Sequence, residues 1–235
     1  MTDQPAKDQD NANRISLSEA ITSRRSVRNF DSAVHITHDE LLGMLDEAAR
    51  APSSVNMQPW RFLIVESEEA RKKLLPLMRL NKRQTRDASD LIVIFGDLEC
   101  YRKAEEIYGQ AAERGILPRL MAKAQLAAIV PAYRKFTREK MTRVVHIDSS
   151  LMAMQLMLVA REHGYDTNPI GGFEEDRIAE TFGLDPNRYV PVIILAVGKA
   201  AKPGHESYRL PARELIWWND AHGTEPGQGE EKERL

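Results

Sequence analysis

A single cysteine and the lack of a long hydrophobic run limit what this 235-residue sequence can be. With Cys100 alone, the chain can form no disulfide framework and no cysteine-based metal site. The most apolar long stretch, LMAMQLMLVA at 151–160, is far shorter than the roughly 20 residues of a bilayer-spanning helix. The first 14 residues are polar and have no apolar core like that of a secretory signal. We therefore expect a cytoplasmic protein without a membrane partner.

An excess of positive charge is also missing. Lys and Arg number 33 against 35 for Asp and Glu, which argues against a general nucleic-acid binder. The sequence contains no GxGxxG and no GxxxxGK[ST], so no phosphate-gripping nucleotide loop is expected. It has no HExxH and no GxSxG, and His35 and His38 have only Asp39 near them, so we expect no metal site. The neighbours of Cys100 give no sign of an activated thiolate, which favours buried packing.

Helices and strands alternate along the chain. Ser16 with Glu19, and Thr37 with Glu40, have the spacing of capping boxes and predict two helix starts. The second helix has an apolar stripe from Leu41 to Ala49 and ends before Pro52. Apolar runs predict strands at 61–66, 91–96 and 190–198, with a short strand near 165–168. Further helices are predicted at 68–80, 144–163 and 174–182.

Residues 98–140 form a charged helical excursion between two predicted core strands. Breaks are expected at 115–118 and again at Pro131. Such a segment is typical of a lid or a partner-facing insertion. The chain shows no internal repeat and no clear linker, which predicts one α+β domain over 15–222 with flexible tails at 1–14 and 223–235.

Three arginines gather in ITSRRSVRNF at 21–30. On a helix, Arg24 and Arg28 would share a face, while Arg25 points elsewhere and Ser26 offers a hydroxyl. Forked guanidiniums beside a hydroxyl suit a phosphate monoester. A solvated helix end, with basic residues balancing the helix dipole, explains the same pattern. The run alone does not decide between the two.

Three other segments have two interpretations each. PSSVNMQPW at 52–60 could present polar side chains to a heteroaromatic ring, or it could be ordinary turn chemistry. The glycine pair of NPIGGF at 168–173 could bring the backbone close to a flat ligand, or it could be only a turn. Arg209 is either a second phosphate ligand or a surface arginine.

Taken together and in order, these segments resemble the FMN-dependent nitroreductase family. The resemblance rests on SRRSVRNF, APSSVNMQPWRF, NKRQTRDASDLIVIFG, GYDTNPIGGF, VPVIILAVGKA and YRLPARELIWW, and it spans residues 14 to 220. It implies a three-layer α-β-α sandwich with a central mixed sheet. It also implies an intertwined homodimer with two FMN sites at the subunit interface.

The resemblance further implies roles for individual residues. No catalytic side chain is obligatory, because the backbone N–H of Gly171 would meet flavin N5 and the flavin carries the hydride. The implied FMN ligands are Arg24, Arg25, Ser26 and Arg28 for the phosphate, ribityl chain and pyrimidine edge; Asn81 and Gln84 at the ring; Pro169, Ile170, Gly171 and Gly172 along one flavin face; Arg209 at the phosphate; and Pro52, Ser53, Ser54 and Asn56 from the other subunit.

The implied reaction is a ping-pong reduction of nitroaromatic compounds or quinones by NAD(P)H through FMN. Two alternatives share the fold: a reductive dehalogenase, whose substrate-gripping set Glu106, Tyr108 and Lys123 loosely permit, and a flavin-fragmenting enzyme. A third is a protein that binds FMN without turnover. The sequence does not choose the acceptor or the pyridine nucleotide.

Overall fold

The computed structural model describes residues 15–221 and 225–227, and the chain divides into two compact units after Gly204. The first unit carries every named strand and α-helix. The second contains the short 3₁₀ helix η5 (Ala212–Glu214) and a backbone hydrogen bond from Gly227 N to Ile216 O of 3.1 Å. The predicted tails at 1–14 and 223–235 lie outside the described residues, apart from 225–227. The single domain over 15–222 stays a prediction.

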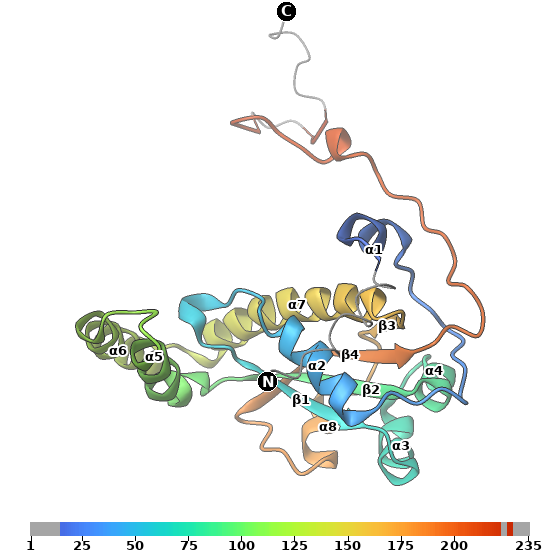
Figure 1. Cartoon of the computed structure of the whole chain (residues 1–235), viewed down its shortest axis with the longest axis horizontal. Coiled ribbons are helices and arrows are strands. Elements are labelled where there is room, and N and C mark those ends of the chain that lie inside the picture. The colour runs from blue at the N-terminus through green and yellow to red at the C-terminus, as the bar shows by residue number, and fades with distance from the viewer. Residues whose placement is uncertain (1–14, 222–224, 228–235) are drawn as a thin grey trace, which may run out of the picture. The chain divides into compact units, whose positions relative to one another are not determined.

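The sheet has the strand order β1-β2-β4-β3 (Figure 1). Its strands are β1 (Trp60–Val65), β2 (Asp90–Asp97), β3 (Asp166–Ile170) and β4 (Tyr189–Gly198), close to the predicted ranges. All three pairings between named strands are antiparallel. The parallel component expected of a mixed sheet is reduced, in the described residues, to an isolated bridge between Ser26 and Thr167.

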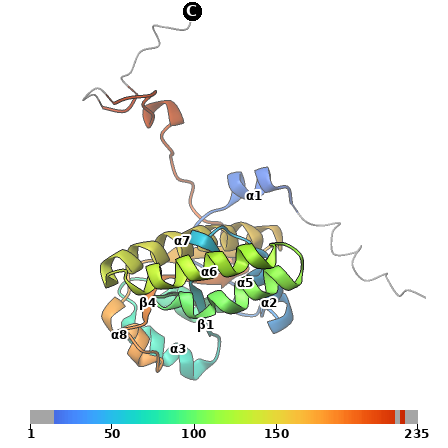
Figure 2. The ribbon, with the colours of Figure 1, turned by 90° about the vertical axis from the view of Figure 1, so that its left-hand side faces the viewer.

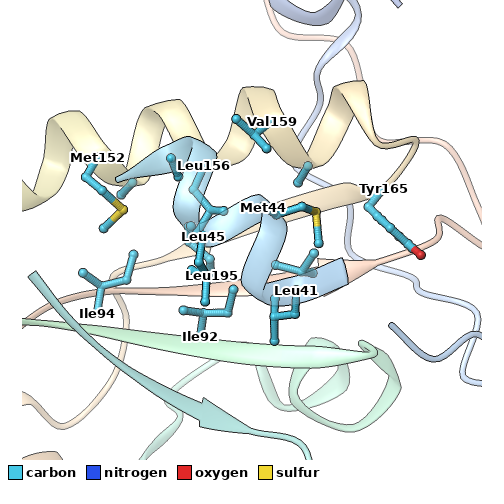
Figure 3. Close-up of a cluster of buried hydrophobic side chains, with 14 of the residues drawn as sticks. Leu41, Met44, Leu45, Ile92, Ile94, Met152, Leu156, Val159, Tyr165 and Leu195 are labelled. Carbon is cyan, nitrogen blue, oxygen red and sulfur yellow. The ribbon is translucent and has the colours of Figure 1, made fainter. Parts of the chain in front are cut away.

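Alternation along β2 produces the layers, because successive side chains of a strand point to opposite faces. Ile92 and Ile94 pack under α2 (His38–Ala48) and α7 (Arg138–Glu162), as Figure 3 shows. The residues that alternate with them, Leu91, Val93 and Phe95, pack on the other face of the sheet against elements that include α3 (Glu68–Leu74) and α8 (Glu175–Thr181). Helices therefore cover both faces, and the predicted α+β class with an α-β-α sandwich is confirmed.

The predicted helix signals are confirmed at their starts and ends. Ser16 Oγ accepts from Glu19 N at the start of α1 (Leu17–Ser23), and Thr37 Oγ1 accepts from Glu40 N at the start of α2, each at 3.2 Å. Gly164 has φ of 76° just beyond α7, the left-handed conformation in which glycine ends helices.

Two predicted helix boundaries were wrong. Pro131 lies inside α6 (Arg119–Arg134), near its C-terminal end, and the chain breaks only at 135–137, before Thr137 caps α7. The helix predicted over 68–80 is shorter: α3 stops at Leu74, and Pro76 takes part in the 3₁₀ turn η3 (Leu75–Leu77). A further helix, α4 (Lys82–Asp87), precedes β2.

The excursion at 98–140 is helical, as predicted. It consists of η4 (Cys100–Lys103), α5 (Ala104–Glu113) and α6, with a break at Gly115, whose φ is 71°. Its apolar side chains join the first half of α7 in a third hydrophobic cluster. Figure 2 shows α5 and α6 side by side in front of the sheet and α7.

Asp97 closes β2 where the chain enters this excursion. Its carboxylate is fully buried and accepts from Arg61 Nη2 at 3.0 Å and from Arg188 Nε and Nη2 at 2.8 Å each. It also accepts from Glu99 N at 2.9 Å. Burial by itself would raise the pKa of Asp97, but the hydrogen bonds from Arg188 and Glu99 and the charge of Arg61 outweigh it and lower the pKa.

Candidate functional site

The arginine segment is an extended strip and not a helix. The helix α1 ends at Ser23, and Arg24 has φ −57° and ψ 131°. Val27 N donates to Thr167 O of β3 at 3.0 Å, and Ala201 N donates to Asn29 O at 2.9 Å. The prediction that Arg24 and Arg28 share a helical face was therefore wrong. Hydrogen bonds to β3 on one side and to the segment after β4 on the other hold this part of the chain extended.

The side chains of the strip differ in exposure. Ser26 and Arg28 are exposed, whereas Arg24 and Arg25 are partly buried. Arg25 Nη1 donates to Thr22 O at 2.7 Å and to Arg24 O at 3.0 Å, so this guanidinium caps carbonyls near the end of α1. A Cβ on Gly204 would lie 2.5 Å from Arg25 Cβ, so the chain passes this close to the strip only as glycine.

The predicted ring-binding residues come together at the end of β3. Arg79 N donates to Gly172 O at 3.1 Å, which ties the glycine turn to the segment before α4. A Cβ on Gly172 would lie 3.7 Å from Asn81 Nδ2, and Gln84 Nε2 donates to Asn81 Oδ1 at 3.2 Å. Asn81, Gln84 and the glycine turn thus form one group.

Gly171 offers an open face and a backbone donor. A Cβ built on it would meet no atom within 4 Å. Its N–H finds no acceptor among residues 15–221 and 225–227. Thr167, which bridges to Ser26, and Gly171 stand four residues apart along β3, or about 13 Å in an extended strand. The arginine strip therefore lies beside β3 and the glycine turn follows its end, and the distance between them is comparable to the length of a small ligand.

The loop at 52–58 is held by other elements. Ser54 N and Ser54 Oγ donate to the carboxylate of Asp148 on α7 at 3.0 and 3.1 Å. Tyr108 Oη of α5 donates to Val55 O at 2.9 Å. Pro52, Ser54 and Asn56 are exposed, and Ser53 is partly buried. This predicted partner-facing loop is thus placed by α5 and α7, while the strip and the glycine turn are placed by β3.

Arg209 belongs to the second unit, where its guanidinium donates to Tyr208 O at 3.1 Å. Its assignment to a phosphate stays a prediction.

Asp148 and Tyr133 were missed by the sequence reasoning. Asp148 is 3% exposed in a helical stretch that is otherwise nearly apolar, and a lone carboxylate in such a stretch is a usable signal of a buried polar contact. Tyr133 Oη donates to Ser54 O at 3.4 Å, and the two residues are 79 positions apart in the sequence. No local pattern marks that contact.

Other candidate chemistry does not assemble. In the set considered for a dehalogenase, Glu106 forms an ion pair with Lys103 at 2.6 Å and Tyr108 donates a hydrogen bond to Val55 O. Among the described residues, neither of them contacts Lys123 through a hydrogen bond or an ion pair. Cys100 is fully buried, and burial raises the pKa of its thiol to about 12, so it packs as an apolar residue. No group of three or more His, Cys, Asp or Glu side chains in the described ranges could hold a metal ion.

An apolar face remains open on α7 and α1. Ile147, Leu151 and Met154 of α7 are 41–57% exposed, and Leu17 and Ile21 of α1 are 66% and 55% exposed. Between the two helices lies a cavity of about 490 Å³, lined among others by Leu17, Leu151 and Met154. Such a continuous apolar face is typical of an interaction surface.

An α-β-α sandwich with an arginine strip and an open glycine turn beside one strand is an arrangement that could hold a flat ligand with an anionic tail. The chain belongs to the nitroreductase family: the model of the Nitroreductase family matches residues 21–199. The family expected from the motifs is thereby confirmed.

Relatives match over nearly their whole length. The chain is 48% identical over 200 residues to "Putative NAD(P)H nitroreductase YdgI" of Bacillus subtilis, covering 85% of this chain and 96% of that protein. It is 37% identical over 198 residues to the "CLA biosynthesis enone reductase" of Lactiplantibacillus plantarum, covering 84% and 91%. A crystal structure from Exiguobacterium sibiricum, described as "a putative nitroreductase in complex with FMN", superposes with a TM-score of 0.84 at 46% identity, covering 87% and 97%.

No helix in the described part of the chain is both long enough and apolar enough to cross a membrane.

Proposed function

We propose that this protein is a cytoplasmic FMN-dependent oxidoreductase that uses NAD(P)H to reduce nitroaromatic compounds or quinones. The observation that carries the proposal is the pairing of the arginine strip with the open glycine turn along β3. The family membership and the FMN complex of the Exiguobacterium relative support it.

The residues present fit FMN. A phosphate monoester carries close to two negative charges at neutral pH, and Arg24 of the strip would neutralise part of that charge. The exposed Ser26 hydroxyl is available to the ribityl chain. The free N–H and open face of Gly171 suit a flat ring whose edge accepts a hydrogen bond, and Asn81 and Gln84 would lie at the same ring.

Bound FMN supplies the hydride chemistry, and this chain supplies position and charge. Arg28, exposed on the strip, would place a positive charge at the pyrimidine edge and favour the reduced, anionic form of the ring. The Gly171 N–H would hold the orientation of the ring at N5. NAD(P)H and the acceptor would occupy the same open face in turn, which is ping-pong kinetics.

We further propose a homodimer that joins the open apolar faces of α7 and α1. Five large apolar side chains of these helices lie 41–66% exposed, an arrangement that a subunit interface would bury. The exposed loop at 52–56 would then reach the FMN of the partner subunit.

Spectroscopy on the purified protein tests this proposal. We expect a yellow protein, or a colourless one that turns yellow when FMN is added, and anaerobic NADH or NADPH should bleach the flavin absorption band. A protein that stays colourless with FMN would refute the proposal. Flavin that is bound but not bleached by either nucleotide would instead indicate a protein that binds FMN without turnover.

An acceptor panel then separates the reactions. Besides a nitroaromatic and a quinone, it should hold an α,β-unsaturated ketone, because a relative 37% identical to this chain is named an enone reductase. It should also hold a halotyrosine. Turnover of the halotyrosine alone would favour the dehalogenase alternative, and comparison of kcat/KM across the four compounds ranks the rest.

A further inference from the structure

The loop at 53–58 is strained. Val55, Asn56 and Gln58 have φ values of 45°, 56° and 45°. These are left-handed conformations, which cost about 1–3 kcal/mol each for residues other than glycine, and a β-branched residue such as Val55 is a clear outlier there. A backbone held in this state needs contacts that determine it, and such strain concentrates at ligand clamps.

The first such contact comes from α7. Asp148 is 3% exposed, and each of its oxygens accepts a hydrogen bond from Ser54: Oδ2 from the backbone N–H and Oδ1 from the hydroxyl. The Ser54 hydroxyl is therefore engaged in holding the loop, which changes its expected role from a flavin ligand to an anchor.

Two more contacts come from the insertion. Tyr108 of α5 donates to Val55 O at 2.9 Å, and Tyr133 of α6 donates to Ser54 O at 3.4 Å. Both tyrosines are 7% exposed and lie in the cluster that also buries Met57 of the loop itself. Burial raises the pKa of both hydroxyls, that of Tyr133 to about 12, so both remain donors at neutral pH.

Two further hydrogen bonds lie within the loop. Ser53 Oγ accepts from Gln58 N at 3.0 Å, and Gln58 Nε2 donates to Asn56 Oδ1 at 3.2 Å. The backbone is thus bonded inward to three helices, while residues 54–56 stay exposed. This is the arrangement of a preformed ligand-binding loop.

We propose that the α5–α6 insertion acts as the support of the flavin loop: the Tyr108 and Tyr133 hydroxyls, with the Asp148 carboxylate, position residues 53–58 to contact FMN. This inference rests on the proposed function, since it takes FMN as the ligand. The insertion would then set FMN affinity through the loop backbone, and Tyr108, Tyr133 and Asp148 would be positioning residues that do not touch FMN.

The test compares wild-type protein with Tyr108→Phe, Tyr133→Phe and the double variant, which keep the rings and remove only the hydroxyls. The matched control is Tyr165→Phe, which loses a hydroxyl bond to Glu40 at 2.9 Å, away from the loop. The first measurement is hydrogen exchange in peptides covering 53–58 of FMN-free protein. The second is FMN affinity, with the visible circular dichroism of the bound flavin.

We expect the double variant to exchange the loop amides faster and to bind FMN about tenfold more weakly, with an altered flavin dichroism. Tyr108→Phe should have the larger single effect, because its bond is the shorter one. Asp148→Asn, which keeps one acceptor but loses the second, should act in the same direction. Tyr165→Phe should match wild type in both measurements.

The failures are distinguishable. If wild-type protein binds FMN and the double variant binds it equally well, this inference is wrong and the proposed function stands. If all variants including Tyr165→Phe weaken FMN equally, the effect is a general loss of packing and the inference is again wrong. If wild-type protein binds no FMN, the proposed function fails and the inference fails with it.

Discussion

At the scale of single residues, Asp97 is a buried charge that its neighbours stabilise. Four hydrogen bonds from two arginines and one backbone amide surround a carboxylate with no exposed surface. We expect Asp97→Asn to lower the free energy of unfolding by about 3 kcal/mol, because the change removes the buried anion that two partly buried guanidiniums share. Urea unfolding measures this.

A surface pair provides the control. Glu68 and Lys72 pair at 2.6 Å on α3 with both side chains more than 70% exposed. Glu68→Gln should leave the midpoint of urea unfolding close to that of wild type, because an exposed ion pair contributes little to stability. Equal losses in the two variants would show that the Asp97 cluster contributes no more than a surface pair.

The same carboxylate predicts a pH dependence. Its pKa is lowered below the ordinary value of 3.8 in the folded protein, so the folded state binds the proton less tightly than the unfolded state. The stabilisation is therefore complete above pH 3.8 and is lost as pH falls from there through the folded pKa. The stability difference between wild type and Asp97→Asn should be constant from pH 5 to 7 and shrink below pH 4, measured by urea unfolding at each pH.

Arg24 is the residue on which FMN affinity should depend most directly. Arg24→Ala removes a guanidinium from the strip, and we expect FMN to bind at least about tenfold more weakly, because Arg–phosphate hydrogen bonds are charge-assisted. Fluorescence titration of FMN measures it, with Arg102→Ala as control, since Arg102 pairs with Glu99 in the insertion. Unchanged affinity in Arg24→Ala would remove Arg24 from the phosphate site.

At the scale of elements, the contact of β2 with α7 depends on one glycine. A Cβ on Gly96 would lie 2.7 Å from Val145 Cβ and closer still to its Cγ2. We expect Gly96→Ala to lower the free energy of unfolding by about 2 kcal/mol through overpacking. Thermal unfolding of Gly96→Ala, Val145→Ala and the double variant tests the cause.

The double variant is decisive for that contact. Val145→Ala alone leaves a cavity, but together with Gly96→Ala it makes room for the new methyl group. The two losses should therefore sum to more than the loss in the double variant. Strict additivity would mean that Gly96 is needed for a reason other than α7.

Elements also show where sequence patterns succeed. The capping boxes at Ser16 and Thr37 and the glycine at 164 are local signals, and the structure has each where predicted. The break predicted at Pro131 was wrong because proline removes one helical hydrogen bond and strains the preceding turn, whereas α6 is held on both sides of it by packing in the third hydrophobic cluster. Of the apolar stripe expected on α2, Leu41, Leu45 and Ala48 are buried, but Leu42 is 58% exposed and Met44 is fully buried instead.

At the scale of the whole molecule, the open face of α7 predicts assembly. We expect wild-type protein to sediment as a dimer and Leu151→Asp as a monomer, because Leu151 is 48% exposed at the centre of the apolar face and a charge there would oppose its burial. The monomer should also lose FMN, since each proposed site needs the partner's loop at 52–56.

Leu42→Asp is the matched control, because Leu42 is similarly exposed but lies on α2. It should remain a dimer with FMN bound. A wild-type protein that sediments as a monomer and still binds FMN would contradict the proposed assembly.

The sequence by itself determined the element types, because caps, apolar runs and glycine ends are set by residues close together in the chain. Its ordered motifs also determined the family, and the resemblance that they carry implied the layered sandwich. The sequence also predicted a short strand near 165–168, close to the observed β3. Only the tertiary structure decided that the arginine run is extended, since Thr167 and Ala201, far along the chain, hold it. It likewise decided that Tyr108 and Tyr133 hold the loop at 53–58, because a hydrogen bond across 53 or 79 residues leaves no local pattern.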